Sequence, residues 1–485
     1  MKIANAVRHL AMWSTVALSA AGCEPSTTPL PTSSTALSRD AGADLPSCEA
    51  TLGQERVLYQ SSADTWVTDV RSSSEGYSLI LLENAKHPNQ PSLRLVQSPT
   101  GKEDVDLTPL LPEGAQFRAL SQIRESTVIA LYVLGEEIAL SQLDLQRRAV
   151  AWTISPFALQ HVAVPLYDTM GNTVGSVSPA KSKLTTARWS LRVAALGGDR
   201  YAILGGVQNG TWLLFGARDG RIYKAINVLP DVDRSFRLAA KPGELVVDDR
   251  GDVHILTDLN REDRAAFERI HQIRLSTPDF ATLAVVMTFS GTSPPTIHEP
   301  SLPFCPAPLR AITGVIDVHK DRLAWSGGCD GKPWVVVGDA HSSQGISTEI
   351  GLGSGVGIRS TLINDDDTLS VTGERRQPSE PIGSTSANEA VIARIGRDGK
   401  PISVCSHDSP AGETYRLMRS GISIITYDEL VRFDDPKDGD EELHYGSTIV
   451  RSLAPEFLRP GGLAQGGAAL VAPVRQPGNL ERADD

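Results

Sequence analysis

The sequence predicts an all-β protein, and three observations support this prediction. Apolar residues come in short runs bounded by Gly, Asp, Asn or Pro, which is typical of strands. The runs are continuous rather than alternating, so we expect strands that are covered on both faces. Only segment 261–273 has a spacing compatible with a helix. The clearest runs are Tyr77–Leu82, Val128–Leu134, Trp212–Phe215, Leu245–Val247, Trp334–Val337 and Ile422–Ile425.

A short motif recurs along the chain and sets its period. It consists of a charged residue placed between neighbours that are mostly apolar. The central residues are Asp69, Arg118, Arg192, Arg237, Asp317, Arg359 and Arg416. Each motif opens a strand, and turns such as Asp219-Gly220 and Asp398-Gly399 follow, which are strong hairpin signals. The repeating units begin near residues 65, 116, 189, 236, 311, 357 and 413.

This period predicts the architecture. Units of about 40 to 50 residues with four strands each are typical of propeller blades. The chain therefore resembles a β-propeller over 50–458, with seven four-stranded blades and no named repeat signature. The last unit lacks a clear fourth strand, so we expect the isolated N-terminal strand Arg56–Tyr59 to complete it and remove an exposed sheet edge. Six blades, or two β-sandwich domains divided near 165–187, are the alternatives.

The N-terminal region has the pattern of an export signal that ends at a cysteine. Lys2 and Arg8 flank the start of the chain, and the apolar segment Leu10–Ala21 is too short to span a membrane. Cys23 follows Ala20-Ala21-Gly22, and Ala20 stands where lipoprotein signals usually have leucine. The arrangement resembles the lipobox of bacterial lipoproteins. A plain secretory signal is the alternative.

The resemblance implies a domain plan and a location. It implies a signal peptide over 1–22, lipidation of Cys23 and, since Glu24 rather than Asp follows, an anchor in the outer membrane, facing either side. Segment 23–49, rich in Pro, Ser and Thr, predicts a flexible tether, and the Gly-rich segment 459–485 predicts a disordered tail.

Composition excludes one class of function. The formal net charge is -12 and the chain has no basic run, whereas nonspecific nucleic-acid binding needs clustered Lys and Arg. We therefore expect no nucleic-acid partner. The expected partners are the membrane, through the lipid, and an envelope protein or glycan.

Four cysteines follow Cys23, namely Cys48, Cys305, Cys329 and Cys405. Their spacings match no zinc motif, and an oxidising compartment allows disulfides. Cys305 with Cys329 is the favoured pair because they are closest in sequence. Four free buried thiols are the alternative.

The repeated charged residues are the main candidate site. The first strand of each blade lines the axial channel, so the five arginines, with Asp69 and Asp317, are expected to lie near one axis. A ring of this kind attracts an anion such as a phosphate, a carboxylate or an acidic sugar. The alternative, which the sequence alone favours, is that each arginine bridges neighbouring blades, because buried arginines usually need partners.

Signals for a metal or for catalysis are weaker. The carboxylates of Asp434, Asp438 and Asp440 have the oxygen ligands that Ca²⁺ prefers, although a solvated acidic turn is the favoured interpretation and no cofactor is expected otherwise. The histidines have no zinc-binding spacing. We therefore expect a noncatalytic binding or scaffold module. The alternative is a propeller hydrolase or lyase that acts on an anionic substrate, with Asp69 or Asp317 as acid or base.

Overall fold

The structure is a computed structural model of the 485-residue chain. It describes residues 56–62, 65–84, 91–135, 137–155, 163–167, 172–177, 191–207, 210–230, 244–261, 263–276, 282–290, 295–302, 310–329, 332–342, 345–350, 356–375, 388–397, 400–409, 415–420, 423–428, 431–433, 443–445 and 449–453. Within these residues, no helix is both long and apolar enough to cross a membrane.

Several sequence predictions lie outside the described residues. They are the signal peptide 1–22, lipidation at Cys23, the tether 23–49, the tail 459–485, Cys48, Cys305, Arg237, and the Asp434, Asp438 and Asp440 cluster. Each of them stays a prediction.

Antiparallel four-stranded sheets dominate the fold. The first contains β2 (Thr65–Ser72), β3 (Ser78–Asn84), β4 (Ser92–Ser98) and β5 (Gly101–Asp106). The second contains β6 (Gln116–Leu120), β7 (Thr127–Leu134), β8 (Glu137–Asp144) and β9 (Ala149–Ile154). The third contains β12 (Leu191–Gly197), β13 (Arg200–Val207), β14 (Gly210–Ala217) and β15 (Ile222–Pro230).

An eight-stranded sheet follows. Its first half has β16 (Glu244–Val247), β17 (Val253–Asn260) and β18 (Thr282–Phe289), with β19 (Thr296–His298) paired to β18. Its second half has β20 (Arg310–His319), β21 (Arg322–Cys329), β22 (Lys332–Asp339) and β23 (Gly345–Glu349). The halves meet where β18 and β20 pair in parallel at Thr282–Arg310 and Leu283–Ala311.

Two more four-stranded sheets complete the ring. One contains β24 (Val356–Ile363), β25 (Leu369–Arg375), β26 (Asn388–Ile395) and β27 (Pro401–Ser409). The other contains β28 (Tyr415–Ser420), β29 (Ser423–Asp428), β32 (Ile449–Leu453) and β1 (Arg56–Gln60). Because β1 pairs with β32, the predicted closure by the N-terminal strand is present.

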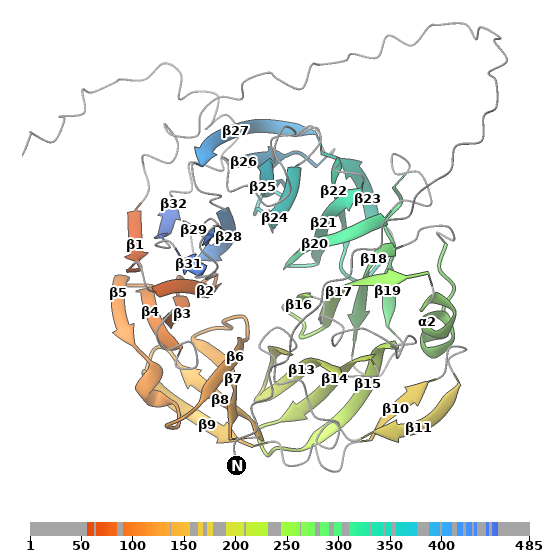
Figure 1. Cartoon of the computed structure of the whole chain (residues 1–485), viewed down its shortest axis with the longest axis horizontal. Coiled ribbons are helices and arrows are strands. Elements are labelled where there is room, and N and C mark those ends of the chain that lie inside the picture. The colour runs from red at the N-terminus through yellow and green to blue at the C-terminus, as the bar shows by residue number, and fades with distance from the viewer. Residues whose placement is uncertain are drawn as a thin grey trace, which may run out of the picture. The chain divides into compact units, whose positions relative to one another are not determined.

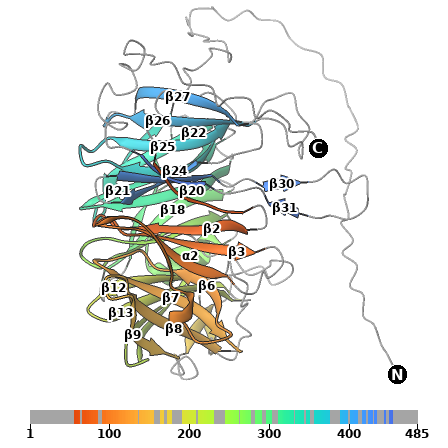
Figure 2. The ribbon, with the colours of Figure 1, turned by 90° about the vertical axis from the view of Figure 1, so that its left-hand side faces the viewer.

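Shorter elements lie outside these sheets. The hairpins are β10 (Val164–Tyr167) with β11 (Thr173–Val177), and β30 (Val431–Phe433) with β31 (Leu443–Tyr445). The second hairpin projects from one face (Figure 2). Among the described residues the helices are η1 (Thr108–Leu110) and α2 (Arg264–His271), and α2 falls in the segment with helix-compatible spacing.

The sheets stand around a common centre, so the chain is an all-β propeller with four-stranded blades (Figure 1). Seven separate blades are not confirmed, because the β18–β20 pairing joins two predicted units and leaves six large sheets among the described strands. In the predicted fourth unit the first described strand is β16, and the predicted start near 236 lies outside the described residues.

The core lies between neighbouring sheets, which explains the continuous apolar runs. On β7, Val128, Ala130 and Tyr132 pack in a cluster with the first sheet. The alternate residues Ile129 and Leu131 pack in a cluster with the third sheet. Since successive side chains of a strand point to opposite faces, a strand between two neighbours must be apolar on both.

Candidate ligand channel

A cavity of about 1520 Å³ lies at the centre of the ring. It is lined by residues of β2, β6, β12, β16, β20, β24 and β28, which are the first strands of their four-strand sets. The lining also carries the carboxylates of Glu75, Glu83, Glu125, Asp199 and Asp249. The channel therefore carries more carboxylates than Asp69 and Asp317, the two that the sequence placed among the arginines.

Most of the predicted site residues lie along this cavity. They are Asp69, Arg118, Arg192, Asp317, Arg359 and Arg416. On β16, Leu245 and Val247 line the channel, so the fourth set of strands contributes apolar side chains there. The structure thus brings the spaced charged residues to one cavity, and their binding of a ligand stays a prediction.

Arg118 has an unusual environment for a cation. Its guanidinium donates to the carbonyl of Phe117 at 2.9 Å and to Oε1 of Gln116 at 2.9 Å. Both acceptors are neutral, and the Nε of Arg118 is buried without a hydrogen-bond partner. Burial lowers the pKa of Arg118 from its ordinary value. A partly buried cation without a carboxylate contact has a cost in free energy, because it has lost part of its hydration. This guanidinium is therefore suited to bind an anion.

Arg192 repeats part of this geometry one sheet further on. Its Nη1 donates to the carbonyl of Leu191, the preceding residue, at 3.0 Å. In both arginines the guanidinium bonds to its own strand beside the cavity.

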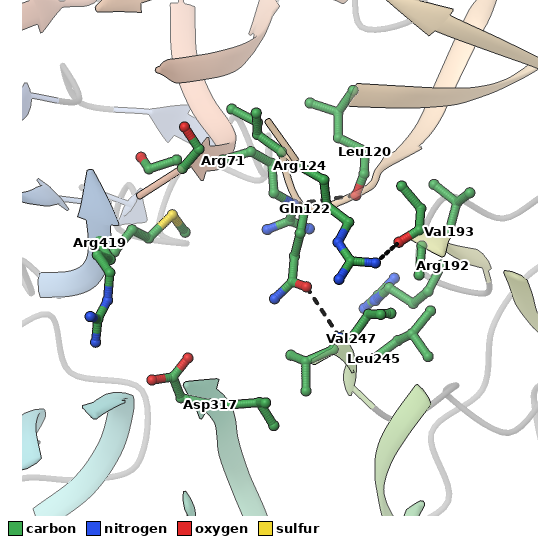
Figure 3. A pocket seen from close by; sticks show the side chains of 18 of the residues that line it. Arg71, Leu120, Gln122, Arg124, Arg192, Val193, Leu245, Val247, Asp317 and Arg419 are labelled. Atoms are coloured by element: carbon green, nitrogen blue, oxygen red, sulfur yellow. Dashed lines mark hydrogen bonds between the residues drawn. The ribbon is translucent and has the colours of Figure 1, made fainter. Parts of the chain in front are cut away.

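Other arginines make bridges from blade to blade, and the sequence analysis missed them. Arg71 on β2 donates to the carbonyl of Leu120 on β6 at 3.2 Å. Arg124, in the turn after β6, donates to the carbonyl of Ala195 on β12 at 3.4 Å and to that of Asp248 at 2.5 Å. The close-up of the cavity shows the bond from Arg71 to Leu120 (Figure 3).

A neutral side chain and a carboxylate bridge sheets in the same way. Oε1 of Gln122 accepts from the backbone N–H of Val247 at 3.1 Å (Figure 3). Oδ2 of Asp317 on β20 accepts from the N–H of Ile363 on β24 at 2.7 Å. Asp69 instead forms an ion pair with Arg71, with 2.8 Å between Oδ1 and Nη1. Both carboxylates that were candidate acids or bases are therefore engaged.

Arg419 closes the other side of the cavity. Its Nη1 lies 2.9 Å from Oδ1 of Asp365 and 2.9 Å from Nε2 of His319, and its Nη2 donates to the carbonyl of Ile363. Burial, together with the charge of Arg419, lowers the pKa of His319. Arg71 and Arg419 could have been found from sequence, since they follow Asp69 and Arg416 within a few residues on the same strands.

The cysteine prediction is only partly within the described residues. Cys329 on β21 and Cys405 on β27 are both buried. Cys305 is outside, so its pairing with Cys329 stays a prediction.

Comparison with known proteins adds little beyond the fold. No family model matches the chain, and no curated protein matches it. The β-propeller domain of the Trilobed protease from Pyrococcus furiosus matches with a TM-score of 0.38 and 9% identity, over 79% of this chain and 96% of that one. Prolyl oligopeptidase B from Galerina marginata matches with 0.42 and 9%, over 84% and 53%. The tricorn protease matches with 0.41 and 10%, over 79% and 35%.

The chain thus spans about half or less of the two longer peptidases. At these identities the likeness concerns the fold alone.

Proposed function

We propose that the protein is a noncatalytic binding module whose central channel holds an anionic group, a carboxylate or a phosphate, at Arg118 and Arg192. The observation that carries the proposal is the guanidinium of Arg118, which faces the cavity with only neutral acceptors and a buried Nε without a partner. An anion there supplies the missing acceptor and the missing countercharge. Charge-assisted bonds of this kind are the strong ones.

The hydrolase or lyase alternative gains no specific support. Asp69 is ion-paired with Arg71, and Asp317 holds a backbone N–H of the next sheet. A general acid or base needs a group within reach of the reacting proton, with a pKa suited to its task. We therefore propose that both carboxylates stabilise the channel wall and do not act as catalytic acids or bases.

Replacing Arg118 by glutamine is expected to weaken anion binding about tenfold to a hundredfold, because a hydrogen bond to a charged group is worth about 1.5–3 kcal/mol. The measurement is isothermal titration of inorganic phosphate and of glucuronate into the full chain. Arg147→Gln is the matched control, since the side chain of Arg147 is 82% exposed and lies outside the cavity lining. Equal affinities of the two variants, or no binding of either probe by the unmodified protein, would reject the proposal.

Two further parts of the proposal concern architecture and location. We propose that the two halves of the eight-stranded sheet act as separate blades, which makes a seven-bladed ring. We also propose that Cys23 carries lipid and tethers the ring to the outer membrane, where it meets an envelope protein or glycan. The lipobox-like segment before Cys23 supports this location.

A Cys23→Ala variant is expected to leave the membrane fraction and appear in the soluble periplasmic or external fraction, because a lipid chain supplies membrane affinity through its buried methylenes. Fractionation of bacterial cells with immunodetection, together with mass spectrometry of the N-terminal peptide, measures this. Unchanged membrane association of the variant would contradict the lipid anchor.

A further inference from the structure

Away from the two channel arginines, three potential metal ligands converge beside strand ends of the eight-stranded sheet. Asp248 directly follows β16, Asp252 directly precedes β17, and His341 follows β22. One donor atom from each lies within 4.8 Å of the others. The three side chains therefore come from both halves of the sheet.

Local turns fix these side chains. Asp248 opens a tight turn in which its carbonyl accepts from the N–H of Gly251 at 3.1 Å. Its Oδ1 accepts from the N–H groups of Arg250 and Asp252, each at 2.9 Å, which aims Oδ2 toward the cluster. The N–H of His341 donates to Oδ1 of Asp339 at 2.7 Å, so the opposite turn is held as well.

The donor atoms have the spacing of ligands rather than of hydrogen-bond partners. His341 Nε2 lies 3.6 Å from Oδ2 of Asp248, and Nδ1 lies 3.5 Å from Oδ2 of Asp252. His341 Nε2 is buried and has no hydrogen-bond partner. Ligand bonds of about 2.0–2.2 Å place two ligands of one ion about 3–4 Å apart, so the 3.6 Å between Nε2 of His341 and Oδ2 of Asp248 suits a shared ion, and one donor atom of each of the three side chains lies within 4.8 Å of the others.

A supporting set of side chains surrounds the carboxylates. Nε2 of His254 lies 3.3 Å from Oδ2 of Asp248, and Nδ1 of the same ring contacts Oγ1 of Thr288 at 2.8 Å. Ser290 Oγ donates to Oδ2 of Asp252 at 3.0 Å. Partners of this kind orient the ligands of metal sites.

We propose that Asp248, Asp252 and His341 bind one divalent transition-metal ion, Zn²⁺, through their carboxylates and the Nε2 of the imidazole. An imidazole ligand favours Zn²⁺ over Ca²⁺ and Mg²⁺, which prefer oxygen ligands. The side chain of His341 is 23% exposed, so the site lies near the protein surface. Asp321 Oδ1 lies 3.7 Å from the same Nε2, so another carboxylate borders the site.

The position of the site gives the ion a mechanical role. It links the β16–β17 turn to the segment after β22, across the same two halves that pair through β18 and β20. Arg124, from the channel, donates to the carbonyl of Asp248. A bound ion thus stabilises the contact between the two halves of the eight-stranded sheet. It also stabilises the backbone at Asp248, to which Arg124 donates. This inference stands independently of anion binding.

The test is titration of Zn²⁺ into tag-free full-length protein that has been treated with chelator and dialysed. We expect about one equivalent bound, measured by calorimetry and by elemental analysis, and a higher unfolding temperature with Zn²⁺. His341→Gln and Asp252→Asn should each weaken binding at least tenfold and abolish the thermal shift. His319→Gln is the matched control, because the His319 side chain is 22% exposed and faces the channel instead.

Three outcomes would overturn the proposal. They are the absence of Zn²⁺ binding by the unmodified protein, equal binding by the His341→Gln and His319→Gln variants, and a response to Ca²⁺ that is stronger than the response to Zn²⁺. Circular dichroism of each variant separates loss of a ligand from loss of the fold. If His341→Gln fails to fold, Asp252→Asn decides by the same criteria.

Discussion

Replacing Leu58 by aspartate is expected to lower the free energy of unfolding by about 4 kcal/mol or more, because it removes a buried apolar side chain and places an unpaired carboxylate in the core. Leu58 lies on β1 and is 3% exposed. It packs in a cluster with Val67, Ile80 and Val450, which belong to the first and last sheets of the ring. The side chain therefore stabilises the place where β1 pairs with β32 and closes the ring.

Val57→Asp provides the control for this prediction. Val57 is the neighbouring residue on the same strand, but its side chain is 44% exposed. The same chemical change there should alter stability by only about 0.5 kcal/mol, as for other surface substitutions. Urea unfolding of both variants, followed by tryptophan fluorescence, gives the comparison. Similar losses in the two variants would mean that closure does not depend on the buried face of β1.

Ring closure could be predicted from sequence because it follows from a count of strands. The segment Arg56–Tyr59 stands alone before the first unit, and the last unit has no clear fourth strand. If the units form a ring, the isolated strand fills the missing place in the last unit. The alternation on β7 was also implied, since a run that is apolar on both faces needs neighbours on both sides. What the pattern did not contain was the parallel pairing of β18 with β20, because such a contact has no spacing signal.

The roles of the channel residues were harder to predict than their position. The repeat places Arg118 and Arg192 beside the cavity, as the structure does. The direction of a long side chain depends on which carbonyls lie within reach, and these belong to strands that are distant in sequence. Arg71 reaches Leu120 and bridges two sheets, whereas Arg118 bonds back to Phe117. Sequence spacing alone does not distinguish these two outcomes.

The proposed metal ligands illustrate the same limit. Asp248 and Asp252 share one turn, but His341 joins them only because the two halves of a sheet are stacked side by side. Spacing rules for metal motifs rely on ligands that are close in sequence. A search of the sequence for paired histidines therefore passes over a site assembled from separate turns.

Acidification from pH 7 to pH 4 is expected to cost the folded state about 3 kcal/mol through His298 alone. His298 lies on β19, is 1% exposed, and its Nε2 contacts Oγ1 of Thr288 at 2.9 Å. Burial lowers the pKa of His298 to about 4, with a further decrease from the charges of His254 and His341 and opposing increases from a hydrogen bond with Ser342 and from Asp339.

The direction of this effect follows from proton binding. The unfolded chain binds a proton at the ordinary histidine pKa of about 6.5, whereas folded His298 stays neutral until about pH 4. The contribution of His298 to stability is therefore complete above about pH 6.5 and is lost progressively as the pH falls toward 4. Urea unfolding at a series of pH values, with a chelator present, should give a shallower decline for His298→Gln than for the unmodified protein, because glutamine is neutral throughout. Parallel pH profiles for the two proteins would show that His298 is not the group that makes the ring sensitive to acid.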